Sequence, residues 1–261
     1  PAANRNYETT FSLNKNKFTA KEFERYTFEV SKTAEYYTTV RNGITDANGN
    51  GAETFEIPAQ YNETGLLTGR VLTTVFDETG RPVNRLKTFD VFTQDVFYGV
   101  RTDQDFFSTK QPIKIPIVAV NKKGIPYNSQ VANVKIIKRK WETILQKAGG
   151  QLKYISQMKE EIIDNKNINI LGSKSVYPFT AKESGDYEFR ISAPNSESYV
   201  SFFFYAYGFG NTYSSSFEVN TEGKIDITLD KDKYNVGDKA KALLKLPFDG
   251  KVLITVERDK M

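Results

Sequence analysis

The 261-residue sequence contains neither cysteine nor histidine. Without cysteine the chain can form no disulfide, no thiolate nucleophile and no cysteine-ligated metal site. Without histidine it lacks the commonest metal ligand, the commonest general base and the side chain that titrates near neutral pH. These two absences remove most of the residue sets on which catalytic and metal-binding proteins rely, although they leave secretion open.

Long apolar runs are also missing. The longest, Val200 to Tyr207, is interrupted by Ser201 and falls far short of the ~18 residues that a membrane-spanning helix requires. We recognise no signal-peptide pattern in the given residues, and we expect a chain that opens with Pro1 to be a processed fragment of a longer protein.

Clustered positive charge is the third absence. The 36 basic and 32 acidic residues give a formal net charge of +4, and charges of both signs alternate in short segments such as Asp230 to Lys233. Proteins that bind nucleic acids gather Lys and Arg on one face. We therefore predict no nucleic-acid partner.

The residues that are abundant favour strands. The sequence has 19 Phe and 15 Tyr but only 2 Met, and apolar and polar residues alternate in many short segments separated by Gly-containing turns. Alternation is typical of strands with one buried face. Turns about every 8–12 residues are typical of β-sandwiches. Examples of the alternating segments are Thr27–Val30, Val71–Val75, Lys114–Ile117, Tyr187–Ile191, Ala240–Leu246 and Val252–Val256.

The sequence also contains a repeated turn pattern and one segment whose secondary structure is ambiguous. Val75–Val83 and Ala119–Tyr127 share one pattern, in which a strand end leads to a Gly turn and then to a Pro two residues later. Lys138–Ile170 is ambiguous, because its middle has apolar residues at helical spacing, whereas Gly149 and Gly150 interrupt it and Ile168–Ile170 alternates. We predict that Lys138–Ile170 is mostly strand, with room for a single helical turn.

Asp46–Gly51 resembles the start of a calcium-binding EF-hand loop, which wraps the cation with oxygens at alternate positions. The twelfth position of such a loop should be a bidentate Glu, but it is Ile57 here, and Glu56 lies one residue early. Asn, Asp and Gly also favour hairpin turns. We interpret the segment as a solvated hairpin loop and predict no metal site.

Phe202–Phe209 is aromatic on both faces of an expected strand. We predict that it is buried in the sandwich and against an adjacent module; if one face is exposed, it is the best binding candidate in the chain. Trp141 is expected in a core. Glu160 and Glu161 would face opposite ways on a strand, so they cannot form a catalytic pair and are expected to be solvated.

Asn62–Thr64 is a glycosylation sequon, relevant only in a eukaryotic secretory pathway. The sequence contains no phosphate-binding Gly-rich loop and no nucleophile motif. We therefore predict that the chain is not an enzyme, that it has no catalytic, cofactor-binding or metal-ligating residues, and that it uses no cofactor.

The C-terminal segments Leu229–Ala242 and Leu246–Asp259 resemble the bacterial α2-macroglobulin family, at the domain that hosts its bait region. There a Tyr-x-x-Gly-Asp-x-Ala turn, here at Tyr234–Ala240, leads into a Pro-Phe-x-Gly hairpin and a Val-Glu-Arg strand end. Further upstream, the preceding two domains of the family are matched by Phe55–Pro58, Asp77–Val83, Phe97–Val100, Trp141 and Phe179–Tyr187.

The resemblance implies an all-β fold of tandem antiparallel fibronectin- or immunoglobulin-like sandwiches, the macroglobulin domains. We expect one at residues 1–94, one at 95–212, a linker at 213–223, and the truncated N-terminal part of a third at 224–261. Each complete sandwich should have about seven strands.

The resemblance also implies a function. In this family a protease cuts a bait segment, a thioester built from a Cys-x-x-Gln motif is released, and the protein closes around its attacker. This chain has no Cys and ends before a bait region is expected, so it would be a scaffold fragment of a large extracytoplasmic inhibitor. The parent would be periplasmic or at the cell surface and membrane-anchored, and would meet proteases only as a whole. The alternative is a module of a bacterial adhesin or glycan-binding surface protein.

Residues 224–261 should supply three strands: Lys224–Asp230, Lys239–Leu246 and Lys251–Arg258. Each has an apolar side, and about 38 residues without a disulfide or a metal rarely fold alone. We expect this apolar side to be buried against the second module or against another copy of the chain, by strand exchange or edge pairing.

Overall fold

The computed structural model describes residues 2–148, 151–208, 226–231, 233–245 and 253–255. Their regular structure consists of strands and three short 3-10 turns, at Lys21–Phe23, Ala59–Tyr61 and Gly172–Lys174. All neighbouring strands but one pair run antiparallel. The prediction of an all-β fold is confirmed. In the part of the chain that is described, no helix has the length and apolar character to cross a membrane.

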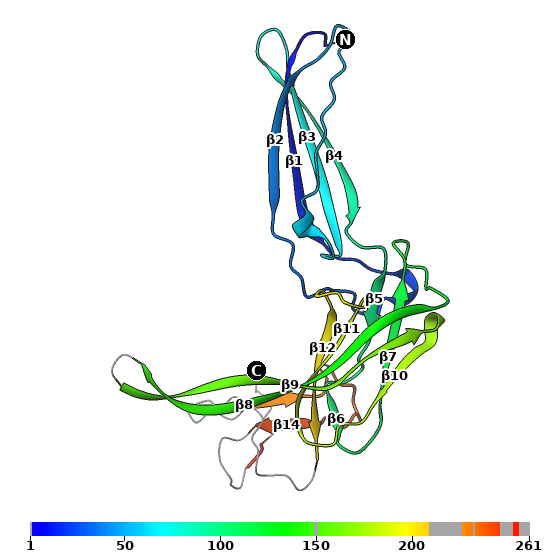
Figure 1. The fold of residues 1–261 in the computed structure, drawn as a ribbon, viewed down its shortest axis with the longest axis vertical. Coiled ribbons are helices and arrows are strands. Elements are labelled where there is room, and N and C mark those ends of the chain that lie inside the picture. The colour runs from blue at the N-terminus through cyan, green and yellow to red at the C-terminus, as the bar shows by residue number, and fades with distance from the viewer. Residues whose placement is uncertain (1, 149–150, 209–225, 232, 246–252, 256–261) are drawn as a thin grey trace.

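The N-terminal region is one long, narrow sheet (Figure 1). Its strands are β1 (Asn6–Asn16), β2 (Tyr37–Ile44), β3 (Leu66–Phe76) and β4 (Pro82–Phe92), in the order β2-β1-β3-β4. Every neighbouring pair is antiparallel.

One face of this sheet is covered by the connection between β2 and β3. Phe55 in that connection stacks on Phe11 of β1 with ring centroids 5.2 Å apart, and Tyr61 is buried and donates a hydrogen bond to the carbonyl of Glu35 at 3.0 Å. The buried cluster consists of Phe11, Leu13, Tyr61, Leu67 and Val91. The opposite face is open, because Val40 and Leu86 are exposed there.

The expected seven strands in two sheets do not occur in residues 1–94. The described residues form four strands of one sheet. Alternation predicts that a strand has a buried face, but an irregular connection can bury that face as a second sheet would. Thr27–Val30, expected to be a strand, makes only isolated bridges at its two ends.

The second region is a two-layer sandwich. A three-stranded sheet in the order β10-β7-β5 lies against a five-stranded sheet in the order β6-β12-β11-β8-β9. The strands are β5 (Phe97–Val100), β6 (Phe106–Ser108), β7 (Ile113–Val120), β8 (Gln130–Ala148), β9 (Gln151–Ile170), β10 (Ser175–Phe179), β11 (Gly185–Ser192) and β12 (Val200–Tyr207).

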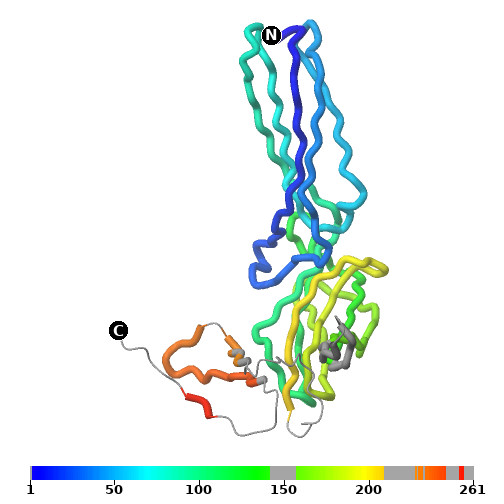
Figure 2. Tube along the Cα trace, turned by 90° about the vertical axis from the view of Figure 1, so that its left-hand side faces the viewer, coloured from blue at the N-terminus to red at the C-terminus, as the bar shows by residue number. Residues whose placement is uncertain are grey.

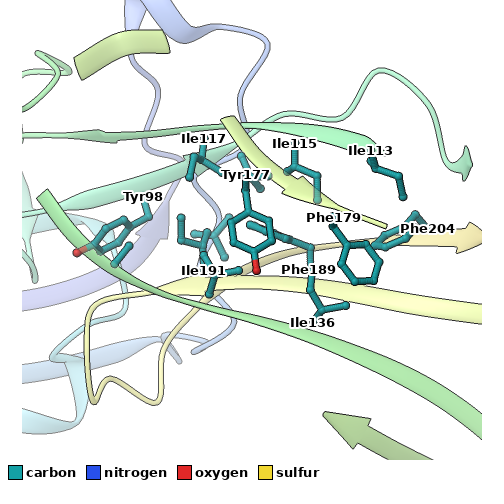
Figure 3. Packing of buried hydrophobic residues seen from close by; sticks show 14 of the residues in the cluster. Tyr98, Ile113, Ile115, Ile117, Ile136, Tyr177, Phe179, Phe189, Ile191 and Phe204 are labelled. Carbon is teal, nitrogen blue, oxygen red and sulfur yellow. The ribbon is translucent and has the colours of Figure 1, made fainter. Parts of the chain in front are cut away.

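The sandwich core lies between these two sheets, as Figure 3 shows. The alternating residues Phe189 and Ile191 of β11 and Ile136 of β8 are completely buried. Tyr177 of β10 meets Phe189 edge-on with ring centroids 5.7 Å apart. The strands expected at Lys114–Ile117 and Tyr187–Ile191 lie in β7 and β11, as predicted.

β8 and β9 form a hairpin that is much longer than the sandwich. The last residue of β8 that pairs with β11 is Arg139, and beyond it the two strands continue as a two-stranded arm, at the left in Figure 1. The pairing shifts register between Ile136 and Ile137, where Ile163 of β9 is the extra residue, and Ile136 and Ile137 are both buried. The prediction that Lys138–Ile170 is mostly strand is confirmed.

Residues 17–31, which we call the clasp, leave the N-terminal sheet and pack on the sandwich. Thr27 forms a bridge with Val100 of β5, and Val30 forms one with Val200 of β12, so the clasp contacts both sheets. Phe18 stacks on Phe97 with ring centroids 3.8 Å apart. The two regions meet end to end at this junction (Figures 1 and 2).

Two glycines permit the clasp to approach closely. A Cβ atom on Gly99 would lie 2.5 Å from Cε1 of Phe28, and one on Gly124 would lie 3.0 Å from Cβ of Ala20. A second contact across the junction is polar, because Ser198 Oγ donates to the carbonyl of Glu63 at 2.7 Å. The domain boundary expected between residues 94 and 95 therefore stays a prediction. Residues 17–31, which precede it, pack against the sandwich that follows it.

The C-terminal region contains β13 (Asp226–Leu229) paired antiparallel with β14 (Ala242–Lys245). Leu253–Thr255, the described part of the third expected strand, is not in a strand. Burial against the sandwich is not found for Ile227 or Ile254, whose exposed fractions are 60% and 55%. The expected linker 213–223 lies outside the described residues.

Candidate functional site

The two faces of β12 differ. Phe204 and Ala206 point into the core, whereas Phe203 and Tyr207 on the other face are 53% and 37% exposed. The prediction that this aromatic strand is buried therefore holds for one face only. The exposed face lies on the outside of the five-stranded sheet. It is the face that the sequence analysis predicts to be the best binding candidate.

A charge network centred on one buried carboxylate lies beside Phe203 on this outer face. Glu188 of β11 is only 1% exposed, and its Oε2 accepts hydrogen bonds from Nη2 of Arg139 and Nη2 of Arg190, both at 2.8 Å. Arg190 Nη2 also donates to Oε1 of Glu160 at 2.9 Å. Two carboxylates thus compensate two guanidinium groups, as burial of charge requires.

Aromatic rings flank both arginines. The Arg139 guanidinium lies 4.3 Å from the ring centroid of Phe203, and that of Arg190 lies 4.5 Å from the ring centroid of Tyr199. Both are within the range of cation–π attraction. Burial lowers the pKa of Arg190, but the hydrogen bond and charge of Glu188 outweigh it, so the pKa is raised. We call Arg139, Glu160, Glu188, Arg190, Tyr199 and Phe203 the arginine–aromatic surface.

Apolar side chains extend this surface toward the hairpin arm. Ile162 and Met158 of β9 are 59% and 37% exposed. The prediction that Trp141 lies in a core is wrong, because Trp141 is half-buried and is in none of the core clusters that the described residues form. It lies two residues beyond Arg139, the last residue of β8 that pairs with β11.

Arginine, aromatic and Met side chains around a buried charge cluster are typical of protein–protein contact surfaces. The carboxylates of Glu160 and Glu188 are both bonded to arginines. The burial of Glu188 could not be predicted from the sequence, because a charged residue between two apolar strand residues, here Tyr187 and Phe189, is normally solvated.

Glu160 and Glu161 do face opposite sides of β9. Glu161 forms an ion pair with Lys140, whereas Glu160 bonds to arginines on the outer face. Both are exposed, as predicted, and Glu160 in addition forms ion pairs with Arg139 and Arg190. Asn62 of the sequon is exposed, but Thr64 is 2% exposed and its hydroxyl donates to the carbonyl of Tyr61 at 2.7 Å.

The calcium-like loop closes on itself. Oδ1 of Asp46 accepts hydrogen bonds from the backbone N–H groups of Asn48 and Asn50 at 2.9 and 2.8 Å, and Gly49 has φ of 83°. The N–H of Asn50 is the main reason why the pKa of Asp46 is lowered. Among the residues that the structure describes, no group of three or more acidic side chains is arranged to hold a metal ion.

The same turn occurs at the two segments with the shared Gly–Pro pattern. Oδ1 of Asp77 accepts from the N–H groups two and four residues later, both at 2.8 Å, and Oδ1 of Asn121 does so at 2.8 and 3.1 Å. Gly80 and Gly124 have φ of 79° and 77°. The likeness of Asp46–Gly51 to a calcium loop is thus accounted for by a turn in which Asp or Asn accepts two backbone N–H groups.

Comparison with known proteins gives three findings. Residues 99–209 match the family model described as bacterial macroglobulin domain 6. This range begins within β5 and ends just past β12, so it corresponds to the sandwich.

Among curated proteins, the chain is 26% identical to an alpha-2-macroglobulin of Rickettsia conorii and 24% identical to one of Pasteurella multocida. Both alignments cover 100% of this chain and 14% of the relative. The chain thus spans about one seventh of the length of these relatives.

Among solved structures, two of Escherichia coli alpha-2-macroglobulin match with TM-scores of 0.50. The native conformation shares 17% identity and is matched over 95% of this chain and 16% of its own. The trypsin-activated form shares 16% identity over 93% of this chain and 17% of its own. At these identities the likeness concerns the fold.

Proposed function

All three comparisons point to the bacterial alpha-2-macroglobulin family, and from that premise we propose that this chain is a scaffold segment of a large protease inhibitor. The observation that carries the proposal is that the alignments run through the entire chain yet cover only 14% of each relative. The segment therefore acts through the parent protein and not as an enzyme.

The junction between the two regions supports a scaffold role. Side chains from the clasp and from the sandwich share one apolar cluster, which includes Phe18, Phe28, Phe97 and Val118. We expect the burial of aromatic rings from both sides to restrict movement between the regions. A segment of this kind holds the parts of the parent at a set spacing.

The proposed parent acts outside the cytoplasm, at the cell surface or in the periplasm as a lipid-anchored protein. Its partners are proteases that it meets as a whole protein, and the other domains of the same chain. Cell fractionation of the parent tests the location: recovery in the cytoplasmic fraction would contradict the proposal.

Inhibition assays test the scaffold role. The purified 261-residue chain, mixed with equimolar trypsin or elastase, is expected to leave cleavage of a protein substrate unchanged, whereas the full-length parent is expected to slow it. Stoichiometric inhibition by the isolated chain would overturn the proposal, as would a parent without any effect on either protease.

We assign the arginine–aromatic surface to contact with another module of the parent. Phe203→Ser should leave the melting temperature of the 261-residue chain nearly unchanged, because the side chain is 53% exposed. In the parent the same substitution should lower the melting temperature. A matched control is Ile125→Ser, which alters a 55% exposed side chain in a turn outside this surface. Equal effects of the two substitutions in the parent would count against the assignment.

We also propose that residues 224–261 mediate a dimer of the isolated chain. A two-stranded sheet is marginal by itself, and Ile227 and Leu229 of β13 are 60% and 48% exposed. Light scattering should give a dimer mass for the chain and a monomer mass for Ile227→Asp. Val236→Asp, in the turn before β14, should remain dimeric. A monomeric unsubstituted chain would refute the dimer without affecting the scaffold role.

A further inference from the structure

Strand β4 lies at one edge of the N-terminal sheet (Figure 1). Among the strands that the structure describes, it pairs with β3 alone. Residues 82–90 of the strand are all exposed. A long exposed edge presents unpaired backbone groups that another strand can use.

Hydrogen bonds at both ends of β4 show which of its backbone groups face β3. The N–H of Thr93 donates to the carbonyl of Gly65 at 3.0 Å, and at the other end the N–H of Asp77 donates to the carbonyl of Arg81 at 3.0 Å. Both pairs continue the register of β3 with β4, so the odd-numbered residues of β4 bond to β3. Backbone groups of successive residues point to opposite sides of a strand. The even-numbered residues of β4 therefore direct their N–H and C=O groups away from β3.

Three of these outward-facing residues, Asn84, Leu86 and Thr88, follow one another along the edge. No residue that the structure describes forms a hydrogen bond with their backbone N–H or C=O groups. Each residue supplies one donor and one acceptor. Three donors and three acceptors are therefore available to an added strand.

Leu86 ends an apolar row that crosses the open face of the sheet. Its partner in β3 is Leu72, and Leu72 lies opposite Thr10 of β1, whose other partner is Val40 of β2. Leu86, Leu72 and Val40 are 46%, 39% and 49% exposed. In an antiparallel pair, residues directly opposite each other place their side chains on the same face. An aliphatic residue opposite Leu86 would therefore extend this row and cover Leu86.

The other face of the edge carries two positive charges. Arg85 and Lys87 flank Leu86, so their side chains point to the opposite face. Both are exposed, and neither forms an ion pair with a residue in the described ranges. Asp90, the acidic residue of β4, lies on the Leu86 face, where it does not offset them.

These charges select the kind of strand that fits. A second copy of β4 would bring the same two positive charges, and basic residues on an edge strand oppose such pairing. Opposite charges at facing positions stabilise a strand pair. The edge therefore favours a strand with acidic residues opposite Arg85 and Lys87.

We propose that the outer edge of β4 binds an extended polypeptide segment in which two acidic residues flank an aliphatic one. The segment adds as an antiparallel strand, with its aliphatic residue opposite Leu86 and its carboxylates opposite Arg85 and Lys87. In strand addition, the main chain supplies affinity and the side chains supply specificity. This edge lies outside the arginine–aromatic surface, so binding here is independent of the scaffold role.

Hydrogen exchange of the 261-residue chain tests whether the edge is open. Without a ligand, the amides of Leu86 and Thr88 should exchange at least about tenfold faster than those of Arg85 and Lys87, because only the latter two bond to β3. Slow exchange at Leu86 and Thr88 would mean that the edge is already covered, and would overturn the proposal.

A short peptide tests the mode of binding on the unsubstituted chain. The probe is fluorescein-Thr-Glu-Val-Glu-Thr-amide, followed by fluorescence anisotropy. When its Val lies opposite Leu86, the N–H of Val points to β4 and the N–H groups of both Glu point away. N-methylation of Val should therefore weaken binding at least about tenfold, whereas N-methylation of one Glu, the matched control, should change it less than about twofold. Equal losses from the two methylations, or no binding of the probe at millimolar concentration, would refute the site.

Charge variants test the choice of an acidic segment. Replacement of both Glu of the probe by Lys should weaken binding at least about tenfold, and added salt should weaken binding of the original probe. Lys87→Gln should reduce this salt dependence. Arg41→Gln removes the same charge from β2, at the opposite edge of the sheet, and should leave binding unchanged. An equal effect of the two substitutions would show that the probe responds to overall charge and does not recognise the β4 edge.

A matched pair of substitutions in β4 completes the test. Thr88→Pro removes an outward N–H without removing a bond to β3, and should weaken probe binding at least about tenfold. Thr88→Ala keeps the N–H and should bind the probe like the unsubstituted chain. Melting temperatures check that both variants fold, and if Thr88→Pro does not, the two N-methylated probes decide. A folded Thr88→Pro that binds as tightly as Thr88→Ala would mean that the segment does not add to this edge.

Discussion

The N-terminal sheet and the sandwich bury their apolar faces in different ways. In the sandwich, two sheets cover each other, so residues such as Phe189 and Ile136 are completely buried between regular strands. In the N-terminal sheet, an irregular connection provides Phe55 and Tyr61 as the cover for Phe11. Similar alternating sequences therefore lead to a two-layer core in one region and a single covered sheet in the other.

The difference determines how each region depends on its neighbour. The clasp adds Val30 to the sandwich core and Phe18, Phe23 and Phe28 to a cluster with Phe97. The sandwich thus receives part of its cover from the chain that precedes it. We expect the two regions to unfold as one unit when the clasp is intact and separately when it is displaced.

The largest effect should come from the sandwich core. Phe189→Ala removes a completely buried ring and should lower the free energy of unfolding by about 3–5 kcal/mol. Because the clasp rests on the sandwich, hydrogen exchange should accelerate in both regions. Phe11→Ala, the matched change in the sheet, leaves the clasp intact and should likewise accelerate exchange in both regions. If both substitutions affected only their own region, the coupling would be absent.

The next largest effect should come from the junction. Gly99→Ala places a Cβ atom 2.5 Å from Phe28 and 3.0 Å from Val118, and overpacking of this kind costs about 1–3 kcal/mol. The double substitution Gly99→Ala with Phe28→Leu should recover part of that loss, as measured by denaturant unfolding. Additive losses would show that Gly99 and Phe28 do not interact across the junction.

A smaller effect is expected at the polar contact across the junction. Ser198→Ala removes the hydrogen bond to the carbonyl of Glu63 and should cost about 0.5–1.5 kcal/mol. Ser192→Ala is a control with similar burial, because the Ser192 hydroxyl bonds within the sandwich, to the carbonyl of Ala193. Only Ser198→Ala should accelerate exchange in residues 17–31. Equal acceleration by both substitutions would contradict this contact.

The smallest effect concerns the turn at Asp46, in the N-terminal region. Its carboxylate has a lowered pKa, chiefly because it accepts the N–H of Asn50, so its contribution to stability is present above the usual pKa of about 4 and is lost as the pH falls through the lower folded value. Asp46→Asn should fold with the same turn, as Asn121 does, and lose this dependence. Melting temperatures of the unsubstituted chain and of Asp46→Asn, measured between about pH 2 and about pH 5, test this expectation. Identical pH profiles would contradict the role of the carboxylate.

The strands themselves could be predicted from the sequence, because alternation reports directly which face of a strand is buried. It correctly predicted β11 around Tyr187 and favoured strand for the hairpin of β8 and β9. It could not say what covers a buried face, so Trp141 was assigned to a core although β8 has left the sandwich at that point.

Contacts between residues that are far apart in the chain also could not be predicted from the sequence. Thr27–Val30 was predicted to be a strand of the first region, but its partners are Val100 and Val200, and nothing in a local pattern indicates such pairing. The burial of Glu188 was missed for the same reason, since it depends on Arg139 from another strand. The sequence indicated that one face of the strand around Phe203 could be a binding surface if it were exposed, but it could not indicate that this face is exposed.

The clasp has a consequence for the order of events during synthesis. Val30 emerges from the ribosome 200 − 30 = 170 residues before its partner Val200. At about 5–20 residues per second, the apolar residues of the clasp wait roughly 8–34 s for a complete sandwich. During that interval the apolar side chains of Phe18, Phe23 and Phe28 remain exposed on the nascent chain. The N-terminal region therefore reaches its final form only after the domain that follows it, and a general chaperone has its best opportunity at the clasp.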